Sequence, residues 1–409
     1  MRIVALTSWC LLVAHGIAAA QPRMAPLPES QWTEAHRAAV AAMGEGAVLH
    51  SVLNNVVQND VRTYLHHPVL TKNLIPFERY ISSASLLAPR DRELLILRTA
   101  WLSRSAYVWA HHAPAARTAG ITADELTRIA RGPDAAGWSP FEVALLRAAD
   151  QLHVSAFVND ATWQALAARY DTRRLLDAVF TVAEFTMVAG TVNSLGVQLE
   201  DGFADRLPAV PYVVSATRDH ERLIGTRARI PPIEPAEWTP EVRQWLDRSG
   251  SGRPVAGIYR TYAHHLPMDQ PRTLVSEHIR QQSTLTARVR ELLIMRIGWL
   301  CRSEYEWAAH APAGRRAGMT QADVDRVIAG PDAPGDAFDG MLLRAVDELH
   351  RDDVISASTW AALSARYDAK QMLDVLTTIG GYRMVSMALN ALGVQLEPNP
   401  ERVPTASAR

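Results

Sequence analysis

The sequence is poor in cysteine: Cys10 and Cys301 are the two thiols in 409 residues. Reduction of a peroxide by a dithiol needs one thiolate to attack and a second thiol to resolve the sulfenic acid. Because Cys10 falls in a segment that we expect to be removed, the mature chain has one thiol. It can form no internal disulfide, and a redox cycle would require a partner thiol. We expect Cys301 to be a small buried hydrophobic residue.

An excess of charge of either sign is also missing. The 42 basic and 43 acidic side chains leave a net charge of −1, which gives no electrostatic reason to expect a nucleic-acid or anionic-membrane partner. The sequence has no phosphate-binding glycine loop, no Gly-x-Ser-x-Gly elbow and no zinc-spaced Cys/His set. We therefore expect a small-molecule substrate and neither a metal nor an organic cofactor.

The amino terminus, MRIVALTSWCLLVAHGIAAAQP, has the order of a secretory signal. One basic residue precedes an apolar run, and three alanines end at Ala20. An uncleaved membrane anchor is the alternative, but the run is short and His15 interrupts it. We expect residues 1–20 to be a signal peptide, and the mature protein to be exported to the periplasm or secreted, without a membrane anchor.

The rest of the chain is a tandem repeat. RELLILRTAWLSRSAYVWAHHAPAARTAGIT at residues 92–122 returns as RELLIMRIGWLCRSEYEWAAHAPAGRRAGMT at residues 290–320, with 21 of 31 positions identical at an offset of 198. LLRAADQLH returns as LLRAVDELH, and NSLGVQLE as NALGVQLE. Such a long period predicts two packed domains rather than a solenoid. We expect one domain at 21–206, a Pro-rich linker at 207–228, and the second domain at 229–409; we call the domains copy one and copy two.

Within each copy the hydrophobic pattern is helical. In RELLIMRIGWL, Leu292, Met295 and Trp299 recur with the spacing of one helix face. Thr122 and Thr320 open capping boxes, and Gly120 and Gly318 stand where the preceding helices should end. No run alternates apolar and polar residues for long enough to predict a strand. The predicted fold class is all-α.

The stretch CRSEYEWAAH at residues 301–310 concentrates groups that could carry chemistry. Glu306 and His310 are separated by four residues, so they share a helix face. A carboxylate beside an imidazole raises its pKa and orients it, which suits a general acid or base near neutral pH. The alternative is structural, because Ser303 and Glu306 also have the spacing of a capping box.

The spacing from Glu291 to His310 resembles that of the carboxymuconolactone decarboxylase and alkylhydroperoxidase D-like superfamily. The peroxidase branch has a Glu, a Cys-x-x-Cys pair and a His in this order; here Ser303 and Glu306 stand at the two cysteine positions. The decarboxylase-like branch has no cysteine pair and has an EYEW-like stretch before the His. The resemblance covers both copies almost end to end. It implies two tandem helical domains of this type, packed as a pseudo-dimer.

The resemblance to the decarboxylase-like branch also implies roles for several residues. His310 would be the proton donor, tuned by Glu306 and Glu291, and Tyr305 would donate a hydrogen bond to a developing oxyanion. The substrate would be held by the remaining candidates, Arg296 or Arg302 for its carboxylate, and Trp307. Packing of the aromatic residues and a surface ion pair of Arg296 are the structural alternatives.

Copy one is not equivalent to copy two. Glu93, Tyr107 and His112 persist, whereas Val108 replaces Glu306. We therefore expect copy two to hold the better-equipped site, and copy one to be partly degenerate or altered for another ligand. A fused pair could mimic a dimer and share one pocket, and the chain could also form a homo-oligomer.

Three functions remain open from the sequence. The first is a cofactor-independent lyase, decarboxylase-like or an isomerase, acting on a small carboxylated or lactone-type molecule. The second is a binding or scaffold protein with a vestigial site, and the third is a thiol-dependent peroxidase. The repeated pairs His66-His67 and His264-His265 do not change this, because adjacent histidines on a helix point in different directions and seldom bind one metal together.

Overall fold

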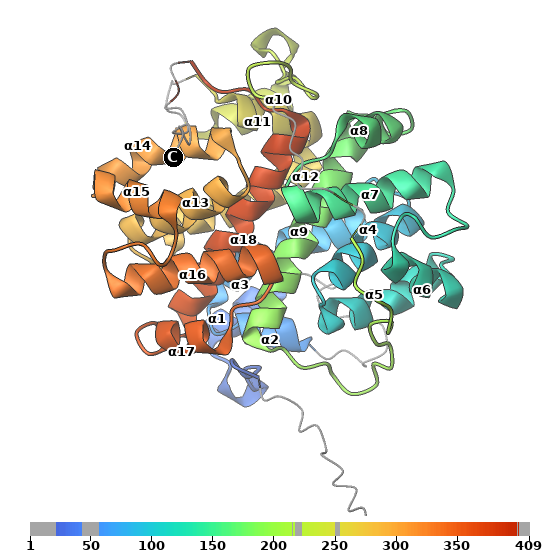
Figure 1. Ribbon diagram of the computed structural model, residues 1–409, viewed down its shortest axis with the longest axis horizontal. Helices are drawn as coiled ribbons and strands as arrows, with labels where there is room; N and C mark the ends of the chain where they lie inside the picture. The colour runs from blue at the N-terminus through green and yellow to red at the C-terminus, as the bar shows by residue number, and fades with distance from the viewer. Residues whose placement is uncertain are drawn as a thin grey trace, which may run out of the picture.

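The computed structural model describes residues 22–42, 57–214, 216, 223–249, 254–398 and 400. Within these residues every regular element is a helix, as predicted, and no strand is present (Figure 1). The predicted signal peptide at residues 1–20 lies outside the described part of the chain, as does part of the predicted linker.

Copy one contributes the elements up to α9. They are η1 (Glu29–Gln31), α1 (Glu34–Ala42), α2 (Asn59–Tyr64), α3 (Pro68–Arg79), the π-helical turn η2 (Tyr80–Ala84), α4 (Pro89–Leu102), α5 (Ala106–Thr118), α6 (Ala123–Arg131), α7 (Pro140–Ser155), α8 (Asp160–Ala167) and α9 (Thr172–Leu195).

Copy two repeats this order. Its elements are η3 (Pro235–Glu237), α10 (Pro240–Leu246), η4 (Asp247–Ser249), α11 (Gly257–Tyr262), η5 (Ala263–His265), α12 (Leu266–Glu277), the π-helical turn η6 (His278–Gln282), α13 (Ala287–Leu300), α14 (Glu304–Arg316), α15 (Gln321–Ala329), α16 (Ala337–Asp352), α17 (Ala357–Ser364) and α18 (Ala369–Leu392).

The long last helix of each copy forms the centre of the molecule. α9 and α18 pack along each other, and the remaining helices of each copy surround them (Figure 1). α9 is long and apolar enough to cross a membrane by length and composition, but its apolar window is wholly buried inside the protein. It is the core helix of a helical assembly, which explains its nearly uniform hydrophobicity.

The two copies meet through related contacts. The side-chain amide of Asn193 at the end of α9 donates to the carbonyls of Ser103 (2.8 Å) and Asp353 (3.2 Å), so it joins copy one to copy two. The amide of Asn390 does the same in reverse, donating to Ala156 (3.2 Å) and Cys301 (2.8 Å). The predicted pseudo-dimer packing is therefore visible at the level of single hydrogen bonds.

The predicted helix boundaries at the functional end of each copy are also present. Thr122 and Thr320 form the predicted capping boxes of α6 and α15. Gly120 and Gly318 follow α5 and α14 with φ of 86° and 93°, a conformation that favours glycine. These caps fix where α14 ends, and therefore how its inner face is aligned with α13.

Candidate functional site

Two antiparallel neighbours of copy two, α13 and α14, build the site. They are joined by a tight turn in which Arg302 takes a left-handed backbone conformation with φ of 53°. The turn folds α14 back along α13, and this brings the imidazole of His310 to the carboxylate of Glu291, 19 residues earlier. The spacing between Glu291 and His310 in the sequence thus arises because α14 packs back against α13.

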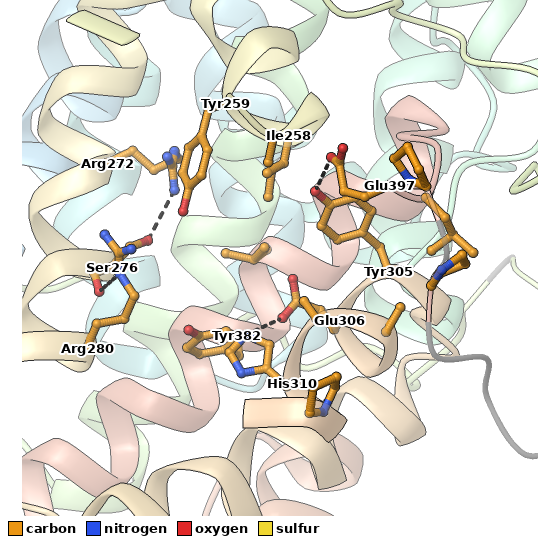
Figure 2. A pocket seen from close by; sticks show the side chains of 18 residues that line it. Ile258, Tyr259, Arg272, Ser276, Arg280, Tyr305, Glu306, His310, Tyr382 and Glu397 are labelled. Atoms are coloured by element: carbon orange, nitrogen blue, oxygen red, sulfur yellow. Dashed lines mark hydrogen bonds and ion pairs between the residues drawn. The ribbon is translucent and has the colours of Figure 1, made fainter. Parts of the chain in front are cut away.

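His310 lies between two carboxylates. Its Nδ1 is 2.7 Å from Glu291 Oε2, and its Nε2 is 3.4 Å from Glu306 Oε2. Figure 2 shows Glu306 and His310 pointing toward one another at the cavity wall. Glu306 and His310 lie on the same face of α14, as predicted.

Burial sets the protonation of these groups. Glu306 is 3% exposed, and desolvation raises the pKa of its carboxyl to about 7, an effect that the nearby His310 partly opposes and Glu291 strengthens. For His310, burial by itself lowers the pKa, but the hydrogen bond with Glu291 and the charge of Glu306 outweigh it, so the pKa is raised above its ordinary value. Both groups can therefore exchange protons near neutral pH.

The capping box at Ser303, the structural alternative for Glu306, is not formed. Ser303 does precede α14, but its hydroxyl accepts no capping hydrogen bond and is buried without a partner. Glu306 Oε2 is likewise buried without a hydrogen bond, because the side chain points to His310 and the cavity instead of the helix end. An uncapped helix start and an unsatisfied buried carboxylate are costly, which favours a functional role for Glu306.

Gly298 on α13 makes room for this carboxylate. A Cβ atom at position 298 would lie 3.1 Å from the Cβ of Glu306, closer than ordinary packing allows. Copy one has Ala100 and Val108 at the two corresponding positions. The glycine and the glutamate thus occur together in the copy that has the acid–base group.

The group formed by Glu291, Glu306 and His310 lies beside a cavity of about 430 Å³. His310 and Glu306 form part of its wall, while Glu291 stands behind His310. The ring of Tyr382 from α18 meets the imidazole edge to face at 4.9 Å and 87°. Tyr305 also lines the cavity, where its hydroxyl donates to Glu397 at 3.1 Å (Figure 2). The volume suits a small organic molecule.

Two arginines on the other side of the cavity were not predicted. Arg272 from α12 and Arg280 from η6 both line it, next to Ser276 (Figure 2). Arg272 is buried and bonded to Asp269 at 2.6 Å, whereas Arg280 is exposed and its Nε contacts the Ser276 carbonyl at 3.3 Å. Arg280 also exerts a positive field that lowers the pKa of His310. It is the cation best placed to meet an anionic substrate.

The structure corrects the expected substrate-binding residues. The guanidinium of Arg296 points to Asp347, at 2.7 Å, and to two backbone carbonyls at the end of α15, so it holds helices together. Arg302 is exposed in the turn before α14, and Trp307 is buried against Trp299. None of the three predicted residues borders the cavity. Trp307 packs in the core, as its structural alternative expected, and Arg296 forms the expected ion pair, but in a buried position and not at the surface.

Cys301 is buried, as expected. It is 1% exposed, and burial raises the pKa of its thiol to about 12. A thiol in this state is almost wholly protonated at neutral pH and does not attack a peroxide. Its backbone carbonyl accepts from Asn390 of the same copy, whose amide also donates to Ala156 of copy one.

Copy one keeps part of the site. His112 Nδ1 is 2.9 Å from Glu93 Oε2, and Phe185 replaces the tyrosine against the imidazole, at 4.8 Å. The hydroxyl of Tyr107 donates to Glu200 at 2.9 Å, the counterpart of the contact between Tyr305 and Glu397. The glutamate–histidine pair is thus common to both copies, but copy one lacks the second carboxylate on Nε2.

Copy one carries a different set of buried acids. Burial raises the pKa of Asp60, and burial together with Asp60 raises the pKa of Glu78 to about 8. The pKa of Glu184 is raised well above its ordinary value by burial and by Glu78. Sequence alignment places these acids at the positions of Ile258, Ser276 and Gly381 in copy two. Ile258 and Ser276 line the cavity of copy two, so residues around the cavity have diverged between the copies, with acids of copy one at two of these positions.

Comparison with known proteins agrees with this architecture. The model described as Carboxymuconolactone decarboxylase family matches residues 68–151 and 270–342, one segment in each copy. Each segment contains the glutamate–histidine pair of its copy, Glu93 with His112 and Glu291 with His310. No curated protein matches the chain.

Proposed function

The chain carries a carboxymuconolactone decarboxylase family domain in each half, and from this we propose that copy two is the catalytic site of a cofactor-independent lyase. The substrate is a small organic acid in which the carboxylate is conjugated through a carbon framework to a carbonyl, as in a lactone acid. The observation that carries the proposal is the group Glu291, His310 and Glu306 at the wall of a cavity of about 430 Å³.

The residues divide the reaction between the two sides of the cavity. Arg280 binds the substrate carboxylate until the bond between that carboxyl carbon and its neighbour breaks. The electron pair of this bond moves into the conjugated carbonyl as CO2 leaves, which forms a dienolate. The hydroxyl of Tyr382 stabilises the developing oxyanion from the cavity wall, and that of Tyr305 does so when it turns from Glu397 to the substrate.

Protonation of carbon completes the reaction. The imidazolium of His310 gives its Nε2 proton to the dienolate, and Glu291 holds the ring by Nδ1 in the required orientation. Glu306, whose pKa is about 7, returns a proton to the imidazole. The hydrogen bond with Glu291 and the charge of Glu306 raise the pKa of His310, which favours the protonated form that donates.

The experiment is a substrate panel of small unsaturated and lactone-type carboxylic acids. CO2 release and NMR of the product in deuterium oxide are measured for the wild type and for His310→Ala. We expect turnover of a panel member with deuterium incorporated at carbon, and a loss of about 10²–10⁴-fold in kcat in the variant, the usual contribution of a general acid. Turnover that survives in His310→Ala contradicts the mechanism. Deuterium exchange without CO2 release would identify an isomerase.

We also propose that the enzyme acts after export. This rests on the order of basic, apolar and small residues before Gln21. Expression with the full N-terminal segment in a bacterial host should yield a mature protein that begins at Gln21, as measured by mass spectrometry of the intact protein. A purified protein that still begins at Met1 contradicts export by cleavage.

A further inference from the structure

A buried cluster lies outside the catalytic cavity, where the two copies meet. His67 precedes α3 of copy one, while His278 begins η6 and Asp374 lies in α18 of copy two. His278 Nε2 is 2.7 Å from Asp374 Oδ1, and His67 Nε2 is 3.4 Å from Asp374 Oδ2. One ligand atom from each residue lies within 4.8 Å of the other two. All three side chains are nearly inaccessible, at 4%, 0% and 1% exposed.

The pseudo-symmetry of the chain supplies an internal reference. The related positions are His265, Tyr80 and Asp177, which meet at the opposite end of the same contact. There the hydroxyl of Tyr80 donates to Asp177 at 2.9 Å and lies 2.7 Å from His265 Nε2. The phenol bridges the acid and the imidazole, so Asp177 Oδ1 and His265 Nε2 both have hydrogen-bond partners without a further ligand, while His265 Nδ1 is buried without one.

Replacement of the bridging phenol by an imidazole leaves the first cluster incomplete. His67 Nε2 and His278 Nδ1 are buried and have no hydrogen-bond partner. Buried polar atoms without partners cost free energy and call for an explanation, such as an ion that binds there. An unpartnered Nδ1 occurs in both clusters, on His278 and on His265, but the unsatisfied Nε2 of His67 is specific to the cluster where His278 stands in place of a tyrosine.

We propose that His67, His278 and Asp374 bind a divalent transition-metal cation of the Zn²⁺ class at the contact between the copies. Two imidazoles and one carboxylate form a donor set that such cations take, with a fourth position left for water. Bonds of about 2.0–2.1 Å at tetrahedral angles separate two ligand atoms by roughly 3.4 Å. The distance from His67 Nε2 to Asp374 Oδ2 already has this value, and the one from His278 Nε2 to Asp374 Oδ1 must open by about 0.7 Å.

The surroundings hold the carboxylate in place. Asp374 Oδ2 accepts hydrogen bonds from the backbone N–H and the hydroxyl of Thr284, at 2.6 Å and 2.7 Å. Such outer contacts orient ligating carboxylates in metal sites. Binding transfers the proton of His278 from Nε2 to the unpartnered Nδ1, or releases it. His67 has at Nδ1 a single long contact with the Leu70 amide (3.4 Å), which gives way when Nε2 binds the metal.

The site spans both copies, so its metal would clamp them together. The ligands come from three segments separated by 211 and 96 residues, and no local spacing of Cys and His can reveal such a set. It is independent of the proposed lyase reaction, because none of its three residues lines the catalytic cavity.

The test uses the full chain, freed of metal with a chelator and without a histidine tag. Zinc content and affinity are measured by mass spectrometry of the metal and by titration against a chromophoric chelator. We compare the wild type with His278→Tyr, which reproduces the cluster that Tyr80 already forms, and with Tyr80→His, which creates a second His, His and Asp set. Circular dichroism verifies that each variant folds.

We expect one equivalent of tightly bound zinc for the wild type, none for His278→Tyr and two for Tyr80→His. Zinc should raise the Tm of the wild type but not that of His278→Tyr. A wild type that binds no zinc overturns the proposal and leaves His278 and Asp374 as a buried ion pair. Equal zinc binding by the wild type and His278→Tyr also overturns it, since the metal would then bind elsewhere.

Discussion

At the scale of single residues, the two copies differ where the cavity lies. Glu306, Arg280 and Tyr382 of copy two correspond to Val108, Ser82 and Phe185 of copy one. The shared glutamate–histidine pair is therefore a common framework, and the added carboxylate, cation and hydroxyl distinguish the copy that we propose to be catalytic. Glu306 is central among them because it is buried, unsatisfied and within reach of the imidazole.

Burial of Glu306 has a measurable cost in stability. Its pKa is about 7 in the folded protein, above the ordinary value of 4.5. Below pH 4.5 the carboxyl is neutral in both the folded and the unfolded state, so its burial does not lower the free energy of unfolding. Between pH 4.5 and 7 the carboxyl ionises in the unfolded state but stays neutral in the folded state. The free energy of unfolding therefore falls until the folded carboxyl also ionises near pH 7. Glu306→Gln should therefore gain stability relative to the wild type between pH 4 and pH 8, by on the order of 3 kcal/mol.

Urea unfolding at the two pH values measures this difference. Glu34→Gln, at an exposed position on α1, controls for the loss of an acidic side chain. A stability difference between Glu306→Gln and the wild type that is the same at both pH values would contradict the assigned pKa.

Residue-level prediction from sequence succeeded for local patterns and failed for distant ones. The pairing of Glu306 with His310 follows from a four-residue spacing, and that of Glu291 with His310 from the family resemblance. Arg280 was missed because it comes from η6, which the sequence does not connect with the stretch 301–310. Arg296 was misassigned because its partner Asp347 is 51 residues away. Side chains that reach across helices are specified by packing, which a linear pattern does not show.

At the scale of elements, the distance between α13 and α14 decides whether the acid–base group can assemble. Gly298 allows the two helices to approach closely at Glu306. The helices themselves were predictable, because their apolar spacing is regular and their caps are local. Their close approach was not, since a glycine within a helix can serve packing or have no role at all.

Gly298→Ala tests this approach. The new Cβ would force the helices apart, so we expect a loss of about 1 kcal/mol in stability together with reduced turnover, although alanine favours a helix. Gly190→Ala is the matched control, because a Cβ there meets its nearest atom at an ordinary 3.4 Å and should stabilise α9 by up to about 1 kcal/mol. The two variants should shift the Tm in opposite directions. A shift in the same direction for both would contradict a packing role for Gly298.

At the scale of the whole molecule, the protein is two copies of one helical unit joined by related contacts. The duplication followed from the repeated sequence, the all-α class from the helical spacing of apolar residues, and the pairing of the copies from the family resemblance. The contacts that join the copies did not, because residues such as Asn193 and Asn390 look like helix-end residues in isolation. Their function depends on the other copy, whose position is a property of the folded chain.

Asn390→Ala should weaken the contact between the copies. It leaves the carbonyls of Ala156 and Cys301 without this donor, at a cost of about 1–3 kcal/mol. Asn73 also joins the copies, through Gln282 at 2.7 Å, but this hydrogen bond is exposed to solvent, so Asn73→Ala should change stability by less than about 0.5 kcal/mol. Urea unfolding of both variants measures the difference, and equal effects would show that burial does not decide the strength of these contacts.

The most direct test of the account is a matched substitution in the two copies. Glu291→Gln and Glu93→Gln each change the carboxylate that holds the histidine, at 2.7 Å in copy two and 2.9 Å in copy one. With a substrate identified from the panel, kcat is measured for both variants. We predict that Glu291→Gln lowers kcat by at least about 10²-fold, while Glu93→Gln leaves it within about twofold of the wild type, a change too small for a lost general acid or base. Equal losses in both variants, or no loss in Glu291→Gln, would contradict the assignment of catalysis to copy two.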